Sequence, residues 1–213
     1  MATKCWCTWI STARVSRRPK ARRRSCRTAA SPNTWKVRAV AAHLRIPLEL
    51  EFVDLTKGAS HTPEYLALNP TGRTPTLVDG DFKVWESVAI MQYLASKAPN
   101  TLWPDDPWSR ADIAPWQCWH LAHWGKEACE PLIIERLVKK LLNLGPPDEA
   151  VVAKALACFN KEAAVLDAHL AKQPYLVGKD LTLADFSVAA STTRSHSPKS
   201  SKLSAGAIFF SAA

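Results

Sequence analysis

Apolar residues recur at helical spacing through much of the second half of the chain. One stripe runs from Ile133 to Leu142 and stops before Gly145-Pro146-Pro147, a combination that ends helices. Another stripe runs from Val152 to Leu170. The pattern therefore predicts two amphipathic helices in this region.

A further helix start is marked by Thr182 and Asp185, which have the spacing of a capping box. Leu181 and Phe186 flank this start at the positions of a hydrophobic staple. After Ala190 the sequence has neither a helical nor a strand period. We therefore expect this helix to be short and the helical region to be truncated.

The first half of the chain alternates between helical and strand patterns. The predicted elements are a helix over Trp35–Leu44, an edge strand over Leu48–Val53, a short helix between Thr62 and Asn69, strands at Thr76–Val78 and Phe82–Trp85 joined by Asp79-Gly80, and a helix over Glu86–Ala95. This order is that of a thioredoxin-like α/β domain without its first strand. That strand should directly precede Ser31, but Ala21–Ala30 has no strand character, and the β-friendly run Cys5–Ile10 lies too early.

Shifts in composition divide the chain. Residues 99–107 are rich in proline and aspartate, which indicates a linker between an α/β domain at 31–98 and an all-helical domain at 108–190. Residues 1–30 and 191–213 are expected to be disordered tails, and the second holds seven serines and no acidic residue.

The net charge of +9 belongs to the N-terminal tail. Residues 1–30 hold nine of the 28 Lys and Arg residues and none of the 19 Asp and Glu residues, so the rest of the chain is balanced. A nucleic-acid-binding surface on the folded part is therefore not expected. Three interpretations of the tail stay open: an organellar transit peptide, an arm that binds polyanions, and out-of-frame sequence without a function. The last interpretation applies to residues 191–213 as well.

The six cysteines are scattered and form no CxxC pair, so we expect no metal site. No apolar run is long enough to span a bilayer, and no signal-peptide core is present. These features fit a reducing, cytoplasmic compartment.

The loop Asn69–Leu77, NPTGRTPTL, carries the first candidate chemistry. Pro75 opens the short strand that follows, a position where proline is tolerated. If the Thr74–Pro75 bond is cis, the Thr74 backbone turns outward and can pair with an extended peptide ligand.

Glu86 and Ser87 carry the second candidate chemistry, because they begin a helix. Free N–H groups and a serine hydroxyl at a helix start suit a carboxylate, whereas the Glu86 carboxylate suits an ammonium. A site that offers both is complementary to the α-carbon end of an amino acid, such as the γ-glutamyl end of a peptide.

These residues resemble the glutathione-binding half of the glutathione S-transferase family. The resemblance runs from about Ser31 to Ala190 through four motifs: SPNTWKVR, HTPEYLALNPTGRTPTL, ESVAIMQYLA and LTLADFSVA. It implies a thioredoxin-like N-terminal domain, here lacking a proper first strand, and a truncated all-α C-terminal domain. It also implies a cytoplasmic, homodimeric enzyme that conjugates glutathione, as co-substrate and without a further cofactor, to a small hydrophobic electrophile.

The resemblance is to serine-type members, the phi and tau classes, and it assigns individual residues. Ser31 falls on the position of the catalytic hydroxyl that stabilises the glutathione thiolate, with a plain helix N-cap as the alternative. Thr74 would pair through its backbone with the cysteinyl part of glutathione. The residues that the resemblance assigns to glutathione binding are His61, Arg73, Thr74, Glu86 and Ser87.

Trp116, Trp119, His120 and His123 recur on one predicted helix. They are candidates for the wall of the electrophile pocket, although this spacing favours packing in a core or an interface. The two histidines lack a carboxylate in a recognised metal-binding arrangement.

A rival interpretation is a catalytically silent glutathione-binding or protein-interaction module, which the missing strand and the truncated helical domain favour. An isomerase or thiol reductase on the same scaffold also stays open, although Ser31 stands where a reductase would carry cysteine. Neither nucleic acid nor a membrane is expected as a partner.

Overall fold

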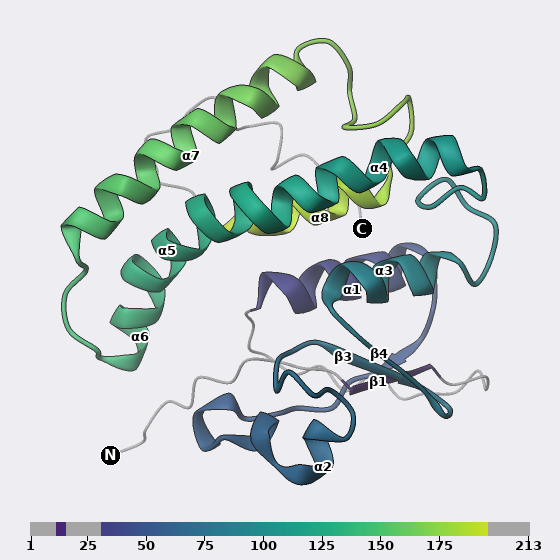
Figure 1. The fold of residues 1–213 in the computed structure, drawn as a ribbon, viewed down its shortest axis with the longest axis horizontal. Helices are drawn as coiled ribbons and strands as arrows, with labels where there is room; N and C mark the ends of the chain where they lie inside the picture. The colour runs from purple at the N-terminus through teal and green to yellow at the C-terminus, as the bar shows by residue number, and fades with distance from the viewer. Residues whose placement is uncertain (1–11, 16–30, 196–213) are drawn as a thin grey trace. The chain divides into compact units, whose positions relative to one another are not determined.

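The computed structural model describes residues 12–15 and 31–195, which belong to two compact units (Figure 1). The first unit is Met1–Ala98 and the second is Pro99–Ala213. The pocket described below lies in the first unit.

A mixed sheet forms the centre of the first unit, and its described strands have the order β2-β1-β3-β4. Strand β1 (Thr12–Val15) runs parallel to β3 (Thr76–Asp79) and antiparallel to β2 (Leu48–Glu49). Strand β4 (Phe82–Trp85) pairs antiparallel with β3. Strand β2 therefore lies at an edge of the sheet, as its alternating sequence predicts.

The expectation that the first strand is missing is wrong. Strand β1 holds the central place in the sheet, with Thr12 opposite Thr76 and Ala13 opposite Leu77. The segment TARV is short and has no apolar run, so its extended state follows from pairing with β3 rather than from a local pattern. The segment directly before Ser31, where the strand was expected, lies outside the described residues.

Helices cover both faces of this sheet. Helices α1 (Pro32–His43) and α3 (Ser87–Ala95) lie together on one face, and α2 (Pro63–Leu66) lies on the other (Figure 1). Two 3-10 turns, η1 (Leu55–Lys57) and η2 (Ala59–His61), lead into α2. The core combines Leu77 of β3 with the buried apolar side chains of α1 and α3, which are Val37, Val40, Ala41, Ile90, Met91, Leu94 and Ala95.

The described part of the second unit is helical, and both predicted amphipathic helices are confirmed. One continuous run consists of α4 (Pro107–Trp119), η3 (His120–Cys129), α5 (Glu130–Ile133), η4 (Ile134–Val138) and α6 (Lys139–Leu142). The stretches η3 and η4 are π-helical, and Asn143 ends the run in the left-handed conformation. Helices α7 (Glu149–Leu170) and α8 (Leu183–Ser195) follow.

The predicted capping box at the start of α8 is present. Thr182 Oγ1 accepts the Ala184 N–H at 3.3 Å, and Asp185 Oδ2 accepts the Thr182 N–H at 2.8 Å. Asp185 Oδ1 also accepts the Leu176 N–H at 2.9 Å, which ties the preceding loop to the helix.

Helix α8 continues to Ser195, so the expectation that it ends near Ala190 is wrong. Ser191, the first residue after Ala190, is buried. Residues 196–213 lie outside the described residues. Among the described helices, none combines the length and apolar character needed to cross a lipid bilayer.

Candidate functional site

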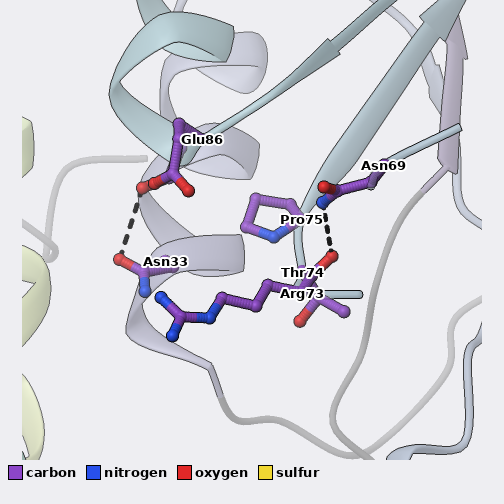
Figure 2. A pocket seen from close by; sticks show the side chains of 7 residues that line it. Asn33, Asn69, Arg73, Thr74, Pro75 and Glu86 are labelled. Atoms are coloured by element: carbon purple, nitrogen blue, oxygen red, sulfur yellow. Dashed lines mark hydrogen bonds between the residues drawn. The ribbon is translucent and has the colours of Figure 1, made fainter. Parts of the chain in front are cut away.

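Three segments of the first unit line one pocket, namely the first turn of α1, the loop before β3 and the start of α3 (Figure 2). The pocket is open to solvent, and its lining residues are Asn33, Asn69, Arg73, Thr74, Pro75, Glu86 and Ser87. The structure thus brings together four residues that the sequence indicated for glutathione binding: Arg73, Thr74, Glu86 and Ser87.

Ser31 precedes α1 in an extended conformation, with φ −80° and ψ 120°. Its carbonyl accepts the N–H groups of Thr34 and Trp35 at 3.0 Å, but its hydroxyl makes no capping hydrogen bond. A helix cap therefore does not account for the serine side chain. Ser31 is not a lining residue of the pocket, but Asn33, two positions later, is one.

A buried hydrogen-bond network holds the loop before β3. Tyr65 Oη and Asn69 Nδ2 both donate to the carbonyl oxygen of Arg73, at 2.7 and 2.8 Å. The Thr76 hydroxyl joins them, because it lies 2.9 Å from Tyr65 Oη and accepts from Asn69 Nδ2 at 3.2 Å. Tyr65, Asn69 and Thr76 are all buried, so water does not compete for these bonds. The network fixes the backbone that carries Arg73 and Thr74.

The Thr74 backbone is available to a ligand. The Thr74–Pro75 peptide bond is cis. Within residues 12–15 and 31–195, no hydrogen bond uses the N–H or the carbonyl of Thr74. An extended peptide can therefore pair with this residue as an added strand would.

Glu86 has an uncommon backbone conformation directly before α3, with φ 68° and ψ 121°. A positive φ in a residue other than glycine costs about 1–3 kcal/mol and persists where the surrounding structure imposes it. The exposed Glu86 side chain makes no capping hydrogen bond to α3, so capping does not explain the conformation. Strain of this kind at the rim of a pocket indicates a binding residue.

Ser87 begins α3 and is buried, and its hydroxyl donates to Asn33 Oδ1 at 3.3 Å (Figure 2). The first N–H groups of a helix have no acceptor within the helix, and the helix dipole makes this end positive. An anion is therefore favoured beside Ser87, and a cation is favoured beside the Glu86 carboxylate. The pocket suits a zwitterionic group.

Family models and curated relatives match most of this chain. The model of the glutathione S-transferase N-terminal domain matches residues 28–96, and that of the C-terminal domain matches residues 126–207. Glutathione S-transferase 3 of Zea mays is 42% identical over 158 residues, which cover 73% of this chain and 70% of the relative. The probable glutathione S-transferase GSTF2 of Oryza sativa is 35% identical and covers 75% of each chain.

The chain belongs to the glutathione S-transferase family. The predictions of a transferase, of a thioredoxin-like domain and of a helical C-terminal domain are confirmed.

Solved structures of the family share its fold. Glutathione S-transferase I from maize, in complex with an atrazine glutathione conjugate, has a TM-score of 0.70 at 28% identity and covers 76% of each chain. The theta-class enzyme of Xanthomonas axonopodis pv. citri, with glutathione bound, has a TM-score of 0.68 at 33% identity and covers 75% of each chain.

His61 of this transferase lies beside the pocket loop and is not a lining residue. Its Nδ1 is 3.0 Å from the Ser60 hydroxyl. A Cβ atom at Gly72 would come within 2.9 Å of His61 Nε2, and Gly72 has a φ of +61°. Gly72 therefore lets the loop pass close to His61, directly before Arg73.

The aromatic residues of α4 pack within the helical unit. Trp116 lies 4.6 Å from His169 of α7, measured between ring centroids, and Trp119 Nε1 donates to Glu162 Oε2 of α7 at 2.8 Å. Trp119 also stacks on Trp124 at 5.7 Å.

The two histidines that follow Trp119 differ in their surroundings. His120 is buried, whereas His123 is exposed and lies 4.0 Å from Glu127. No cluster of His, Cys, Asp or Glu suited to a metal ion occurs in the described part of the chain. The electrophile-pocket assignment stays a prediction.

Sequence reasoning missed the two asparagines of the pocket and a buried lysine. Lys36 is 1% exposed, and burial lowers its pKa from the ordinary 10.5 to about 7 against the opposing effect of the Glu86 carboxylate. Thr34, Val37 and Val40 of the same helix are buried as well, and no local sequence pattern marks the burial of Lys36.

Proposed function

We propose that the transferase binds glutathione in the pocket of Figure 2 and conjugates its thiolate to a small hydrophobic electrophile. The observation that carries this proposal is the presence of Glu86, the start of α3 and the open Thr74 backbone in one pocket. Glutathione offers an ammonium, a carboxylate and a peptide backbone as complementary groups. The maize and Xanthomonas structures hold ligands of this chemistry.

The γ-glutamyl end supplies the ammonium and the first carboxylate. Its ammonium pairs with the Glu86 carboxylate, and its carboxylate lies at the N-terminus of α3 beside Ser87. The cysteinyl part pairs with the backbone of Thr74. The glycine carboxylate pairs with the Arg73 guanidinium, and His61 beside the pocket loop is a further candidate for this end of glutathione.

Ser31 then stabilises the thiolate. Its hydroxyl donates a hydrogen bond to the sulfur, and the positive end of α1 adds to the stabilisation, so the pKa of the glutathione thiol falls toward neutrality. The sulfur lone pair forms a C–S bond with the electrophilic carbon. In a substitution, the leaving group departs with its bonding pair; in an addition, the carbon that gains the electron pair takes a proton from water.

Glutathione acts here as a co-substrate, and we propose no further cofactor. We also infer a homodimer in the cytoplasm, in keeping with family resemblance. Size-exclusion chromatography with light scattering tests the dimer, which a monomer at micromolar concentration would contradict.

The rival interpretation of a catalytically silent module loses one of its two grounds, because β1 is present in the sheet. A measurement of conjugating activity distinguishes an active transferase from a catalytically silent module. The purified chain should conjugate glutathione to a model aryl halide, and Ser31→Ala should lower kcat more than it raises the KM for glutathione. Glutathione binding by calorimetry without any conjugation would favour the silent module.

The matched control is Ser96→Ala, which removes a hydroxyl that donates to the Gln92 carbonyl on the exposed end of α3. This control should keep the kcat of the unmodified chain. If Ser31→Ala also keeps it, Ser31 is not the catalytic hydroxyl.

A further inference from the structure

The Asn33 side chain is the pocket group that the proposed function leaves unused. It is exposed, stands in the first turn of α1 and lines the pocket (Figure 2). Its Oδ1 accepts the Ser87 hydroxyl at 3.3 Å. Among the described residues, this is the one hydrogen bond that the Asn33 side chain makes.

In the structure, the Oδ1 end of the Asn33 amide faces Ser87, which leaves the Nδ2 end for a ligand. Asparagine carries an acceptor oxygen and an NH₂ group with two donor hydrogens. Because Ser87 occupies Oδ1, Nδ2 is the end left over, and it can only donate. Its partner in a ligand must therefore be an acceptor.

The surroundings define that acceptor further. The N-terminus of α3 begins at Ser87 and favours an anion. Glu86 is the carboxylate of the lining and would repel an anion placed against it. An anion thus fits between Asn33 Nδ2 and the α3 N-terminus, with the ligand's cation turned toward Glu86.

We propose that Asn33 binds the γ-glutamyl carboxylate of glutathione directly, through Nδ2, while its Oδ1 orients the Ser87 hydroxyl. This inference rests on the proposed function and adds a contact to the same site. The Asn33 amide also links two helices, because Asn33 belongs to the first turn of α1 and is hydrogen-bonded to Ser87, the first residue of α3. A carboxylate bound to Asn33 would therefore contact α1 at a residue only two positions after Ser31.

Asn33→Asp separates the donor role from a structural role. An aspartate keeps an acceptor for the Ser87 hydroxyl, but it replaces the NH₂ donor by a second carboxylate. The KM for glutathione should rise about tenfold to a hundredfold, with a smaller change in kcat. Asn33→Ala, which removes the donor without adding charge, should raise this KM about threefold to tenfold.

The matched control is Asn160→Asp, which makes the same change on the exposed surface of α7. It should leave the KM for glutathione within about twofold of the unmodified chain. If Asn33→Asp stays within the same range, Nδ2 does not bind the carboxylate. If Asn33→Ala raises the KM but Asn33→Asp does not, Asn33 acts solely by orienting Ser87. Either result overturns the proposal.

A ligand lacking the carboxylate provides the second test. In 4-aminobutyryl-cysteinyl-glycine the γ-glutamyl carboxylate is absent, so Asn33→Ala should weaken calorimetric binding of glutathione but leave binding of this analogue unchanged. Equal weakening of both ligands would contradict the contact. If the unmodified chain does not bind glutathione at all, the proposed function fails together with the Asn33 contact. If the unmodified chain binds glutathione but Asn33→Ala weakens both ligands equally, the Asn33 contact alone fails.

Discussion

The Tyr65 hydroxyl donates to the Arg73 carbonyl at 2.7 Å, across eight positions of sequence, and so joins α2 to the loop that lines the pocket. Asn69 donates to the same oxygen at 2.8 Å. Two donors on one carbonyl fix the direction of the peptide that follows it, which is the peptide of Thr74.

Tyr65→Phe should therefore raise the KM for glutathione. The variant keeps the buried ring but removes one of the two donors, so we expect a loss of about 1–2 kcal/mol of folding stability and a KM about threefold to tenfold higher. Thermal unfolding and steady-state kinetics measure the two effects. Tyr93→Phe is the control, since its hydroxyl donates to Asp79 at 2.8 Å and not to the loop. An equal rise in KM for both variants would argue against a positioning role for Tyr65.

Glu86→Gly and Glu86→Gln should separate two effects of Glu86, the strain of its backbone conformation and the binding of glutathione by its carboxylate. Both remove the carboxylate, and both should raise the KM for glutathione about tenfold or more. Glycine alone accepts the positive φ of this position, so Glu86→Gly should be about 1 kcal/mol more stable than Glu86→Gln. Thermal unfolding of the two variants checks the difference. A less stable Glu86→Gly would mean that the backbone conformation stores no strain.

Lys36→Met should stabilise the chain most strongly below about pH 7, the value to which burial lowers the pKa of Lys36. Below that pH, Lys36 is charged in the folded and unfolded states, and folding carries the cost of burying the ammonium, reduced by the Glu86 carboxylate. Between pH 7 and 10.5 the folded state has lost a proton that the unfolded state keeps, so the stability of the unmodified chain rises with pH.

The advantage of Lys36→Met should thus shrink by about 1.4 kcal/mol per pH unit over that interval. Urea titrations at several pH values give the comparison, with the exposed Lys126→Met as control. An advantage independent of pH would show that Lys36 keeps its proton when folded.

Trp119→Phe should show whether Trp119 serves packing within the helical unit or lines the electrophile pocket. The change deletes the indole N–H that donates to Glu162, a carboxylate 7% exposed and 3.4 Å from Lys161. We expect a loss of about 1–3 kcal/mol of stability with an unchanged KM for the electrophile at saturating glutathione. Trp108→Phe, at a position 83% exposed, controls for the loss of an indole. A higher KM without a loss of stability would place Trp119 in the electrophile site.

Several site residues could be predicted because their chemistry is local. Glu86 and Ser87 precede an apolar helical pattern, and Pro75 opens a strand, so a helix terminus and an exposed backbone follow from neighbouring residues. Asn33 and Lys36 could not be predicted in the same way. The role proposed for Asn33 depends on its hydrogen bond to Ser87, 54 positions later. The lowered pKa of Lys36 depends on the burial of its side chain in the fold.

The sequence by itself determined the order of most elements, the capping box of α8, the carboxylate and hydroxyl at the start of α3 and the family. Each of these depends on periodicity or on residues a few positions apart. The tertiary structure alone decided that Thr12–Val15 is a central strand and that α8 extends to Ser195. In both cases local propensity is weak, and the state is set by partners distant in sequence: β2 and β3 for the strand, and the packing that buries Ser191 for the helix.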